Sequence, residues 1–439
     1  MPPKKQPKKK NQKKKNKSKQ TKTNQPNVFI PKALNPDIKQ MLPHEIVEDE
    51  ILQYKSKKFW DSQPVQKLTE KRPEKAQALI EQKVEEIRKK SLPLPEGFEW
   101  FLIDLKDEKI MDELYQLLSG HYVEDNDSMF RFNYSPEFLR WALLVPNYEP
   151  DWHLGVRVIE SKKIVGFISG TPINLKIFDK DMRIAEVNFL CAHKSLRSKG
   201  LGPILIKEIT RRINLKGIFQ AVYTAGRLLP SPVATATYYH RIINNEKLLD
   251  VGFTQLDEDT TLEKMKRLNK IPEKLACSNL KKIEKANIPS ACKLLNDYLA
   301  KKTISVQFDE AEFEWLFVSR DNVVYTYVIE NEKNHQVTDL LSFYILDSTV
   351  INHPKHSSFK AAYAFYVVPN TIDINILMLD ALVLGQSLGC DVFNCLNIMD
   401  NDDFIHNLRF GLGDGHLHYY LYNWASPEIL PKEIGLTML

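Results

Sequence analysis

The sequence predicts an α/β protein built from two similar halves, and three observations support this fold class. The apolar run at 187–192 is typical of a strand, and after a short basic loop a helical spacing of apolar residues follows at 205–213. The order helix, strand, polar turn and second strand occurs twice, at 137–168 and at 312–345. A chain of 439 residues is long enough for two to three ordinary domains with a substantial core.

The positive charge of the chain is concentrated at its N-terminus. The net charge is +5, yet the first 22 residues hold 11 lysines and no acid, so the rest of the chain is mildly acidic. Residues 1–27 consist mainly of Lys, Gln, Asn and Thr, a composition that cannot bury enough surface to fold. We therefore expect a disordered basic tail, of the kind that binds ribosomes, nucleic acid or anionic surfaces.

Cysteine usage and hydropathy predict a cytoplasmic protein. The five cysteines include no CxxC pair and read as reduced thiols. No apolar run reaches about 18 residues, so we expect no transmembrane helix. The N-terminal charges are not followed by the apolar stretch of a signal peptide.

The elements before the central strand can be assigned in chain order. The charged run Ile80–Lys90 predicts a helix that ends at Pro93–Gly97. Glu99–Asp104 predicts the first strand, and Lys109–Leu118 predicts the next helix. The stretch 120–134 is rich in acids and Asn, which predicts a mobile surface loop.

The internal similarity divides into three corresponding pairs of segments. They are a helix (Glu137–Trp141 and Glu312–Trp315), a first strand (Val156–Glu160 and Tyr327–Glu330) and a second strand (Ile164–Ile168 and Leu340–Ile345). Only the first copy is followed by a glycine-containing loop at the matching place. We therefore expect only the first half to carry the site described next.

The basic loop Arg197–Gly202 joins the central strand to a helix and predicts an anion site. Pro203 suits the first turn of that helix, and Gly217 stands where its C-terminal cap belongs. Free N–H groups at a helix N-terminus and the positive end of its dipole attract phosphate, and glycine lets backbone and phosphate approach closely.

The longer string around this loop carries a family resemblance. The spacing R-x-x-G-x-G resembles the pyrophosphate loop of the GCN5-related acyltransferases. Three segments together, Glu186–His193, Leu196–Lys199 and Ile204–Arg212, resemble the signature of the N-myristoyltransferases, and the likeness runs from about Lys58 to Leu439. Gly200 and Gly202 depart from it, because the family usually has Arg or Lys at the first position and Ala at the second.

The resemblance implies two pseudo-twofold-related GCN5-related acyltransferase-like halves in one compact unit. Residues 28–97 would form an arm that contacts coenzyme A, 98–268 would bind acyl-CoA and 269–439 would bind peptide. The residues implied in myristoyl-CoA binding are Lys58, Phe59, Trp60, Tyr122, Phe189, Leu190, Cys191, Ala192, Arg197, Ser198, Lys199, Gly200, Leu201 and Gly202. No metal is expected, because the short-spaced histidine pairs lack further ligands.

The same resemblance implies a peptide groove under the loop at 120–134, bordered by the glycine turn at 410–415. The implied peptide contacts are Val123, Phe130, Phe132, Tyr134, Asn188, Thr224, Tyr238, His240, Ser342, Asp414 and Leu439.

Acyl transfer from a thioester needs donors for the developing oxyanion and a base for the amine. The resemblance assigns the donors to the backbone N–H groups of Phe189 and Leu190, where a strand irregularity would free them from the ladder. It assigns the base to the α-carboxylate of Leu439, close to Thr224. Cys191 is the obvious nucleophile candidate. We reject it because an apolar strand raises a thiol pKa and direct attack needs no acyl-enzyme.

We therefore expect a monomeric enzyme that transfers myristate from myristoyl-CoA to proteins with an N-terminal glycine. One alternative keeps the fold but uses a shorter acyl donor, as an N-acetyltransferase. The other is a non-catalytic ribosome- or RNA-binding protein that acts through its lysine tail. We also expect Gly200→Arg to be tolerated, because it restores the usual charge of the family.

Overall fold

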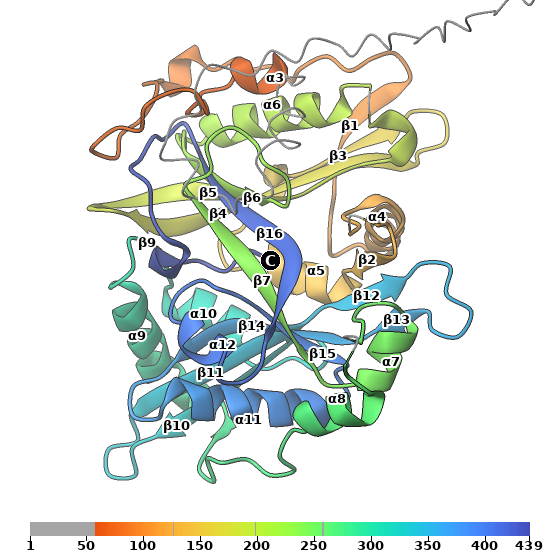
Figure 1. The fold of residues 1–439 in the computed structure, drawn as a ribbon. Helices are drawn as coiled ribbons and strands as arrows, with labels where there is room; N and C mark the ends of the chain where they lie inside the picture. Colours follow the sequence, from red (N-terminus) through yellow and green to blue (C-terminus); the bar gives the residue numbers. More distant parts are fainter. Residues whose placement is uncertain (1–57, 126, 198, 257–258) are drawn as a thin grey trace, which may run out of the picture.

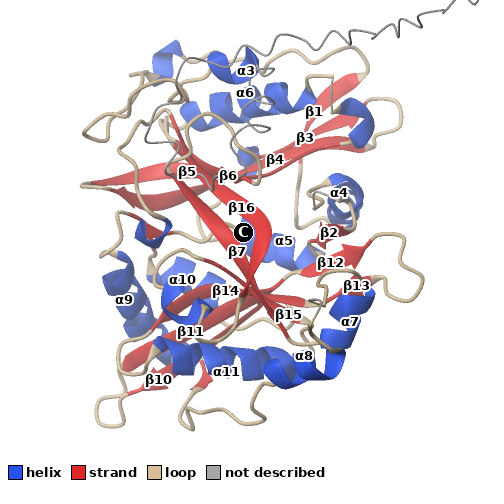
Figure 2. Cartoon of the chain, in the orientation of Figure 1, coloured by secondary structure: helices blue, strands red, loops and turns tan. Residues whose placement is uncertain are grey.

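The computed structural model describes residues 58–439 except 126, 198 and 257–258. The predicted tail, residues 28–57 of the predicted arm and Ser198 lie outside the described residues. Figures 1 and 2 show strands passing through the middle of the molecule, with α6 near one end and α11 near the opposite end.

The first half begins with the short helix α3 (Lys58–Asp61) and continues with alternating strands and helices. Its main elements are β1 (Phe98–Leu102), α4 (Glu108–His121), β2 (Phe130–Asn133), α5 (Pro136–Leu143), β3 (His153–Val158), β4 (Ile164–Ile177), β5 (Lys180–Ala192), α6 (Leu201–Asn214), β6 (Ala221–Ala225), β7 (Ala234–Ile242), α7 (Asn245–Asp250) and α8 (Leu262–Leu268).

The second half repeats the mixture of helices and strands. Its elements are β8 (Lys281–Lys282), α9 (Ile288–Leu299), β9 (Ile304–Gln307), α10 (Glu310–Phe317), β10 (Val324–Glu330), β11 (Val337–Ile345), β12 (Asp347–Val350), β13 (Ser358–Phe359), β14 (Ala361–Val368), α11 (Ile374–Ser387), β15 (Val392–Leu396), α12 (Asp402–Ile405), β16 (Gly411–Tyr422) and β17 (Ile434–Gly435).

One large sheet joins the two halves. Its strand order is β1-β3-β4-β5-β6-β16-β7-β15-β14-β11-β10-β8, and β12, β13 and β2 form a separate small sheet. β16 comes from the end of the chain but lies between β6 and β7 of the first half. The halves are therefore interwoven, and residues 423–439, which include β17, lead from the inserted strand to the chain terminus.

Three apolar clusters hold the layers together. On α6, the side chains of Leu205, Ile209 and Ile213 pack with residues of β3 and β4 in one cluster. α11 contributes to a second cluster beneath β10 and β11. The largest cluster takes residues from both halves, including Met438 next to the chain end.

The predicted internal similarity is confirmed as a repeated helix–strand–strand order. α5 is followed by the antiparallel pair β3–β4, and α10 is followed by the antiparallel pair β10–β11. The two helices also exchange contacts. The indole Nε1 of Trp141 donates to the carbonyl of Leu316 at 3.2 Å, and that of Trp315 donates to the carbonyl of Trp141 at 2.8 Å.

Two local predictions were wrong. The run Ile80–Lys90 forms only a short 3-10 turn at Val84–Glu86. The carbonyls of Arg88 and Lys89 accept hydrogen bonds from the Arg211 guanidinium instead of from helical N–H groups. The predicted loop at 120–134 ends in strand β2, which pairs with β12.

Candidate active site

The centre of the candidate site is a bulge in β5. The β4–β5 ladder pairs Ser169 with Asn188 and Phe167 with Cys191, and its register shifts between these pairs. Phe189 takes a left-handed φ of 53°, a strained conformation for a bulky residue. The predicted strand irregularity at Phe189 and Leu190 is therefore confirmed.

On its other edge, β5 pairs with β6 only briefly. The parallel ladder joins Ala185 and Glu186 to Ala221 and Val222. Farther along β6, Thr224 pairs with Tyr419 of the inserted β16. The bulge thus lies beyond the end of one ladder and inside a register shift of the other, so Phe189 and Leu190 have no partner residue in either ladder.

Asn188 links the bulge to the end of the chain. Its amide oxygen accepts the N–H of Phe189 at 3.0 Å, and its amide nitrogen donates to a terminal oxygen of Leu439. Leu190 keeps 39% of its side chain exposed, whereas Phe189 is buried. The terminal carboxylate therefore contacts the residue that directly precedes the two proposed backbone donors.

The last residues of the chain are fixed inside the protein. The Tyr419 hydroxyl donates to the Leu436 carbonyl at 3.0 Å. Thr437 donates its N–H to the Tyr366 hydroxyl at 3.1 Å, and its own hydroxyl donates to Phe365 at 3.0 Å. Figure 1 places the C-terminus in the middle of the view, over β7 and β16. This anchoring holds an end of the chain that consists mainly of apolar residues, Gly435–Leu439, whereas chain ends are ordinarily poorly ordered.

The basic loop leads from β5 to α6. Gly200 is the N-terminal cap of α6 with φ 82°, and Leu201, Gly202 and Pro203 form the first turn. No neighbouring atom lies within 4 Å of a Cβ built on Gly200, so its backbone conformation and not space requires glycine. Gly200→Arg would therefore set backbone strain against the charge that it restores, and our expectation that the change is tolerated stays a prediction.

Cations surround this loop. Arg197 donates to the His121 carbonyl, and Lys194 forms an ion pair with Glu124 at 2.6 Å. Lys199 is exposed. Burial lowers the pKa of His121 to about 4, with further lowering from His193 and the nearby cations, so its ring adds no charge at neutral pH. Arg197 and Lys199 were both predicted to bind phosphate, and both lie in the described part of the loop.

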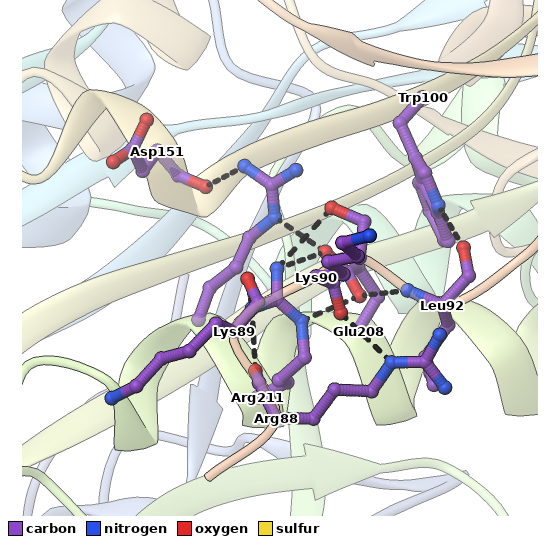
Figure 3. Close-up of polar contacts among 10 residues, drawn as sticks. Arg88, Lys89, Lys90, Leu92, Trp100, Asp151, Glu208 and Arg211 are labelled. Carbon is purple, nitrogen blue, oxygen red and sulfur yellow. Dashed lines mark hydrogen bonds and ion pairs between the residues drawn. The ribbon is translucent and has the colours of Figure 1, made fainter. Parts of the chain in front are cut away.

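Glu208 of α6 forms a buried polar network that joins this helix to the segment before β1 (Figure 3). This fully buried carboxylate accepts bonds from Arg211 at 2.6 Å, Arg212 at 3.0 Å and the N–H of Leu92 at 2.9 Å. Arg211 in turn holds the carbonyls at 88 and 89. The segment 88–92 is thus attached to α6 along its buried side.

The aromatic segment of the arm lies against the same half. Trp60 is buried and stacks on Tyr223 of β6, with ring centroids 5.7 Å apart. Phe59 meets Trp60 edge-on at 5.1 Å and lies 5.8 Å from the Lys207 ammonium of α6. Lys58 begins α3. These residues border the helix that follows the basic loop.

Aromatic rings cover the bulge on the peptide side. The ring centroids of Tyr122, Tyr134 and Phe189 lie 5.1 to 5.9 Å apart. Burial raises the pKa of Tyr238 to about 12, so this phenol stays protonated. The wall continues through rings on β2, β13 and β14, in the contacts Phe130–Phe359 and Phe132–Tyr363. Val123 is 47% exposed at the rim.

His240 and the glycine turn form another part of the wall. The His240 Nδ1 lies 2.6 Å from the amide oxygen of Asn394. Burial lowers the pKa of His240, and the hydrogen bond with Asn394 and the charge of Asp414 partly offset this. A Cβ on Gly413 would lie 2.3 Å from the His240 Nε2, so the turn must have glycine there. Asp414 itself is exposed.

Ser342 is not presented to a substrate in this structure. It is fully buried, and its hydroxyl lies 2.8 Å from that of Thr326. Sequence reasoning also missed two polar groups of the site, Asn394 beside His240 and Glu186 on β5. Glu186 could have been found by strand periodicity, because residues two apart on a strand share a face and Asn188 was already implicated.

Cys191 lies in the strand beside the bulge but is poorly suited to attack. It is buried, and burial raises the pKa of its thiol to about 12. The predicted elevation is confirmed. Among the described residues, no group of three or more metal-ligating side chains is found, and no helix is long and apolar enough to span a membrane.

Comparison with known proteins identifies the family of the chain. The N-terminal domain of myristoyl-CoA:protein N-myristoyltransferase matches residues 79–236, and the C-terminal domain matches residues 250–435. Glycylpeptide N-tetradecanoyltransferase 2 of Bos taurus is 47% identical over 380 residues, covering 87% of this chain and 76% of that protein. Glycylpeptide N-tetradecanoyltransferase 1 of Arabidopsis thaliana is 43% identical over 401 residues, with coverages of 89% and 91%.

The solved structures agree. A Saccharomyces cerevisiae N-myristoyltransferase crystallised with bound myristoyl-CoA is 37% identical and has a TM-score of 0.84, covering 88% of this chain and 95% of that chain. Both domains, the curated relatives and the fold point to the same conclusion. The chain belongs to the N-myristoyltransferase family of acyltransferases.

Proposed function

We propose that this protein transfers myristate from myristoyl-CoA to the α-amino group of an N-terminal glycine. The observation that carries the proposal is the convergence at β5. The strand ends in a basic, glycine-containing loop, bulges at Phe189 and contacts the chain terminus through Asn188. An anion site, two oxyanion donors and a carboxylate therefore lie along one strand.

In the proposed reaction, the thioester carbonyl oxygen accepts from the N–H groups of Phe189 and Leu190, and the Phe189 N–H exchanges its bond to the Asn188 amide oxygen for this one. The glycine ammonium meets the terminal carboxylate of Leu439, with Asn188 and Thr224 beside it. After deprotonation, the amine attacks the carbonyl directly, the C–N bond forms and the C–S bond breaks. The thiolate of coenzyme A leaves with a proton from the same nitrogen.

The protonation states set the main energetic cost. A free α-carboxyl has a pKa of about 3.5 and an α-ammonium about 7.8, so direct transfer is uphill by roughly 6 kcal/mol. Burial disfavours both charged forms, which raises the first pKa and lowers the second. The partly buried position of the terminus supports the α-carboxylate of Leu439 as the base, because burial brings the pKa values of carboxyl and ammonium closer together.

The acyl donor would be bound by the loop and by the arm. Arg197, Lys199 and the N-terminus of α6 would hold the pyrophosphate, and Phe59 and Trp60 would lie against the nucleotide end. The peptide would run along the aromatic wall toward His240 and Asp414. A side chain on the attacking residue would hinder a near-attack approach beside buried rings, which explains a requirement for glycine.

The other properties that the resemblance implies are part of the same proposal. The protein would act as a monomer in the cytoplasm, and its lysine tail would bring it to ribosomes, where N-terminal glycines emerge. No metal takes part in the proposed reaction.

The test is transfer of labelled myristate to a Gly-initiated peptide, with an Ala-initiated peptide as control. A series of acyl-CoA donors of different chain length separates this activity from N-acetyl transfer. Myristoyl-CoA binding by a protein lacking residues 1–27 separates it from a tail-driven RNA-binding role. Absence of transfer to the glycine peptide would overturn the proposal.

A further inference from the structure

A small, partly open cavity is lined in part by the C-terminal residue Leu439. Its volume is about 60 Å³, and its lining includes Thr171, Glu186, Glu312, Thr437 and Leu439. A water molecule needs roughly 10–15 Å³ of such volume and two or more polar partners. The cavity is therefore large and polar enough for a few water molecules between Glu186 and the chain terminus.

Glu186 occupies the wall of this cavity on the same strand as the proposed oxyanion donors. It lies two residues before Asn188, so the two side chains share one face of β5. The Asn188 amide hydrogen bonds with Glu186 and also donates to Leu439. One side chain thus connects the internal carboxyl to the terminal carboxylate.

No cation faces Glu186 from the cavity. Among the described residues that line the cavity, none is Lys or Arg. The titratable groups around Glu186 are the Tyr366 phenol of β14, the Tyr419 phenol of β16, Glu312 of α10 and the α-carboxylate. Burial raises the pKa of Glu186 to about 7, and the bond from Asn188 offsets this only in part.

The proposed reaction needs an acceptor for one of the protons that the substrate amine loses. Amide formation removes two protons from the glycine ammonium, and the coenzyme A thiolate takes one of them. The terminal carboxylate is a weak acceptor for the other, because its ordinary pKa lies about 4 units below that of the amine. An acceptor whose pKa lies near that of the amine would hold the proton at little cost.

We propose that Glu186 is a proton-relay residue. The Leu439 carboxylate first receives a proton from the substrate ammonium, and this proton then passes through cavity water to Glu186. This inference rests on the proposed function. The N–H bond that breaks leaves its electron pair on nitrogen for attack on the thioester. The proton then stays on Glu186 until product release, when it passes to solvent.

The test is single-turnover acyl transfer from pre-bound myristoyl-CoA, measured from pH 5.5 to 9 for the wild type, Glu186→Gln and Glu186→Asp. The relay requires ionised Glu186, so the wild-type rate should rise through pH about 7 and then level off. Glu186→Gln should lower the rate by about 100-fold, as for loss of a general base, and should lose this inflection. Myristoyl-CoA affinity should not change.

Glu312→Gln is the matched control. It removes the other side-chain carboxyl of the cavity, which accepts the backbone N–H of Asp309, the N-terminal cap of α10, at 3.2 Å. Its rate and pH profile should match the wild type. Glu186→Asp keeps a carboxylate and should keep the inflection at a lower rate.

The outcomes separate the two proposals. A wild-type protein without transfer to the glycine peptide overturns the proposed function. A Glu186→Gln variant with wild-type rate and profile overturns the relay and leaves the function standing. If the Gln variant does not fold, the wild type and Glu186→Asp decide, and a flat wild-type profile across pH 7 overturns the relay.

Discussion

Replacing Glu208 by Gln tests whether its buried contacts with Arg211, Arg212 and Leu92 stabilise the fold. Glu208 has no solvent exposure and accepts from two guanidinium groups and one backbone N–H (Figure 3). Burial by itself would raise the pKa of this carboxyl. The bonds from Arg211, Leu92 and Arg212 outweigh burial and lower the pKa to about 2.

The size of the effect follows from linkage between protonation and folding. The shift from the ordinary 4.5 to about 2 corresponds to about 3 kcal/mol in favour of the folded state. Because the folded pKa lies below the unfolded one, this stability is fully present above pH about 4.5. It is lost as the pH falls toward about 2.

The assay is urea unfolding of the wild type and Glu208→Gln between pH 3.5 and 8. We expect the free energy of unfolding of the variant to be about 3 kcal/mol lower than that of the wild type, by a constant amount from pH 5 to 8 and by less below pH 5. Glu149→Gln is the control, because its pair with Lys216 is on the surface and should be worth at most about 1 kcal/mol. A gap below about 1 kcal/mol at pH 7, or one that widens in acid, would refute the reasoning.

Three further variants probe the site. Deleting Leu439 moves the carboxylate by about 3.5 Å and should greatly lower the single-turnover rate at unchanged myristoyl-CoA affinity, whereas Leu439→Met should stay active; equal rates would remove the terminus from the mechanism. Gly200→Arg adds backbone strain of about 1 kcal/mol at a positive φ and an ion pair with phosphate worth about 0.2–1 kcal/mol. Because the two effects oppose each other, calorimetry should find a myristoyl-CoA affinity within a few-fold of that of the wild type. A large gain in affinity would contradict the strain. Removing residues 1–27 should leave peptide turnover intact and abolish salt-sensitive polyanion binding in a pull-down, and lost turnover would show that the tail acts in catalysis.

The sequence was informative where the determinants are local. The strand, basic loop and helix at 187–213 follow from hydrophobic spacing and glycine chemistry, and the structure has them in that order. The bulge at Phe189 was expected from the resemblance. Its left-handed φ could not be predicted, because neighbouring strands and not the local residues impose it.

The errors arose where a distant partner decides the conformation. The charged run at 80–90 has the composition of a helix, but Arg211, more than 120 residues later, binds its carbonyls in another conformation. The elevated pKa of Glu186 likewise depends on enclosure by strands β14 and β16, whose positions no spacing within β5 reveals.

The insertion of β16 explains why a chain terminus can serve as a reactive group. Termini are ordinarily the least ordered part of a domain. Here, β16 is bonded on one side to β6 and on the other to β7, so the segment that follows it starts from the centre of the sheet. Tyr419 of this strand then holds Leu436, and Tyr366 of β14 holds Thr437. The terminal carboxylate is thereby fixed relative to the bulge by strands of both halves, and this position depends on chain length more than on the identity of the last side chain.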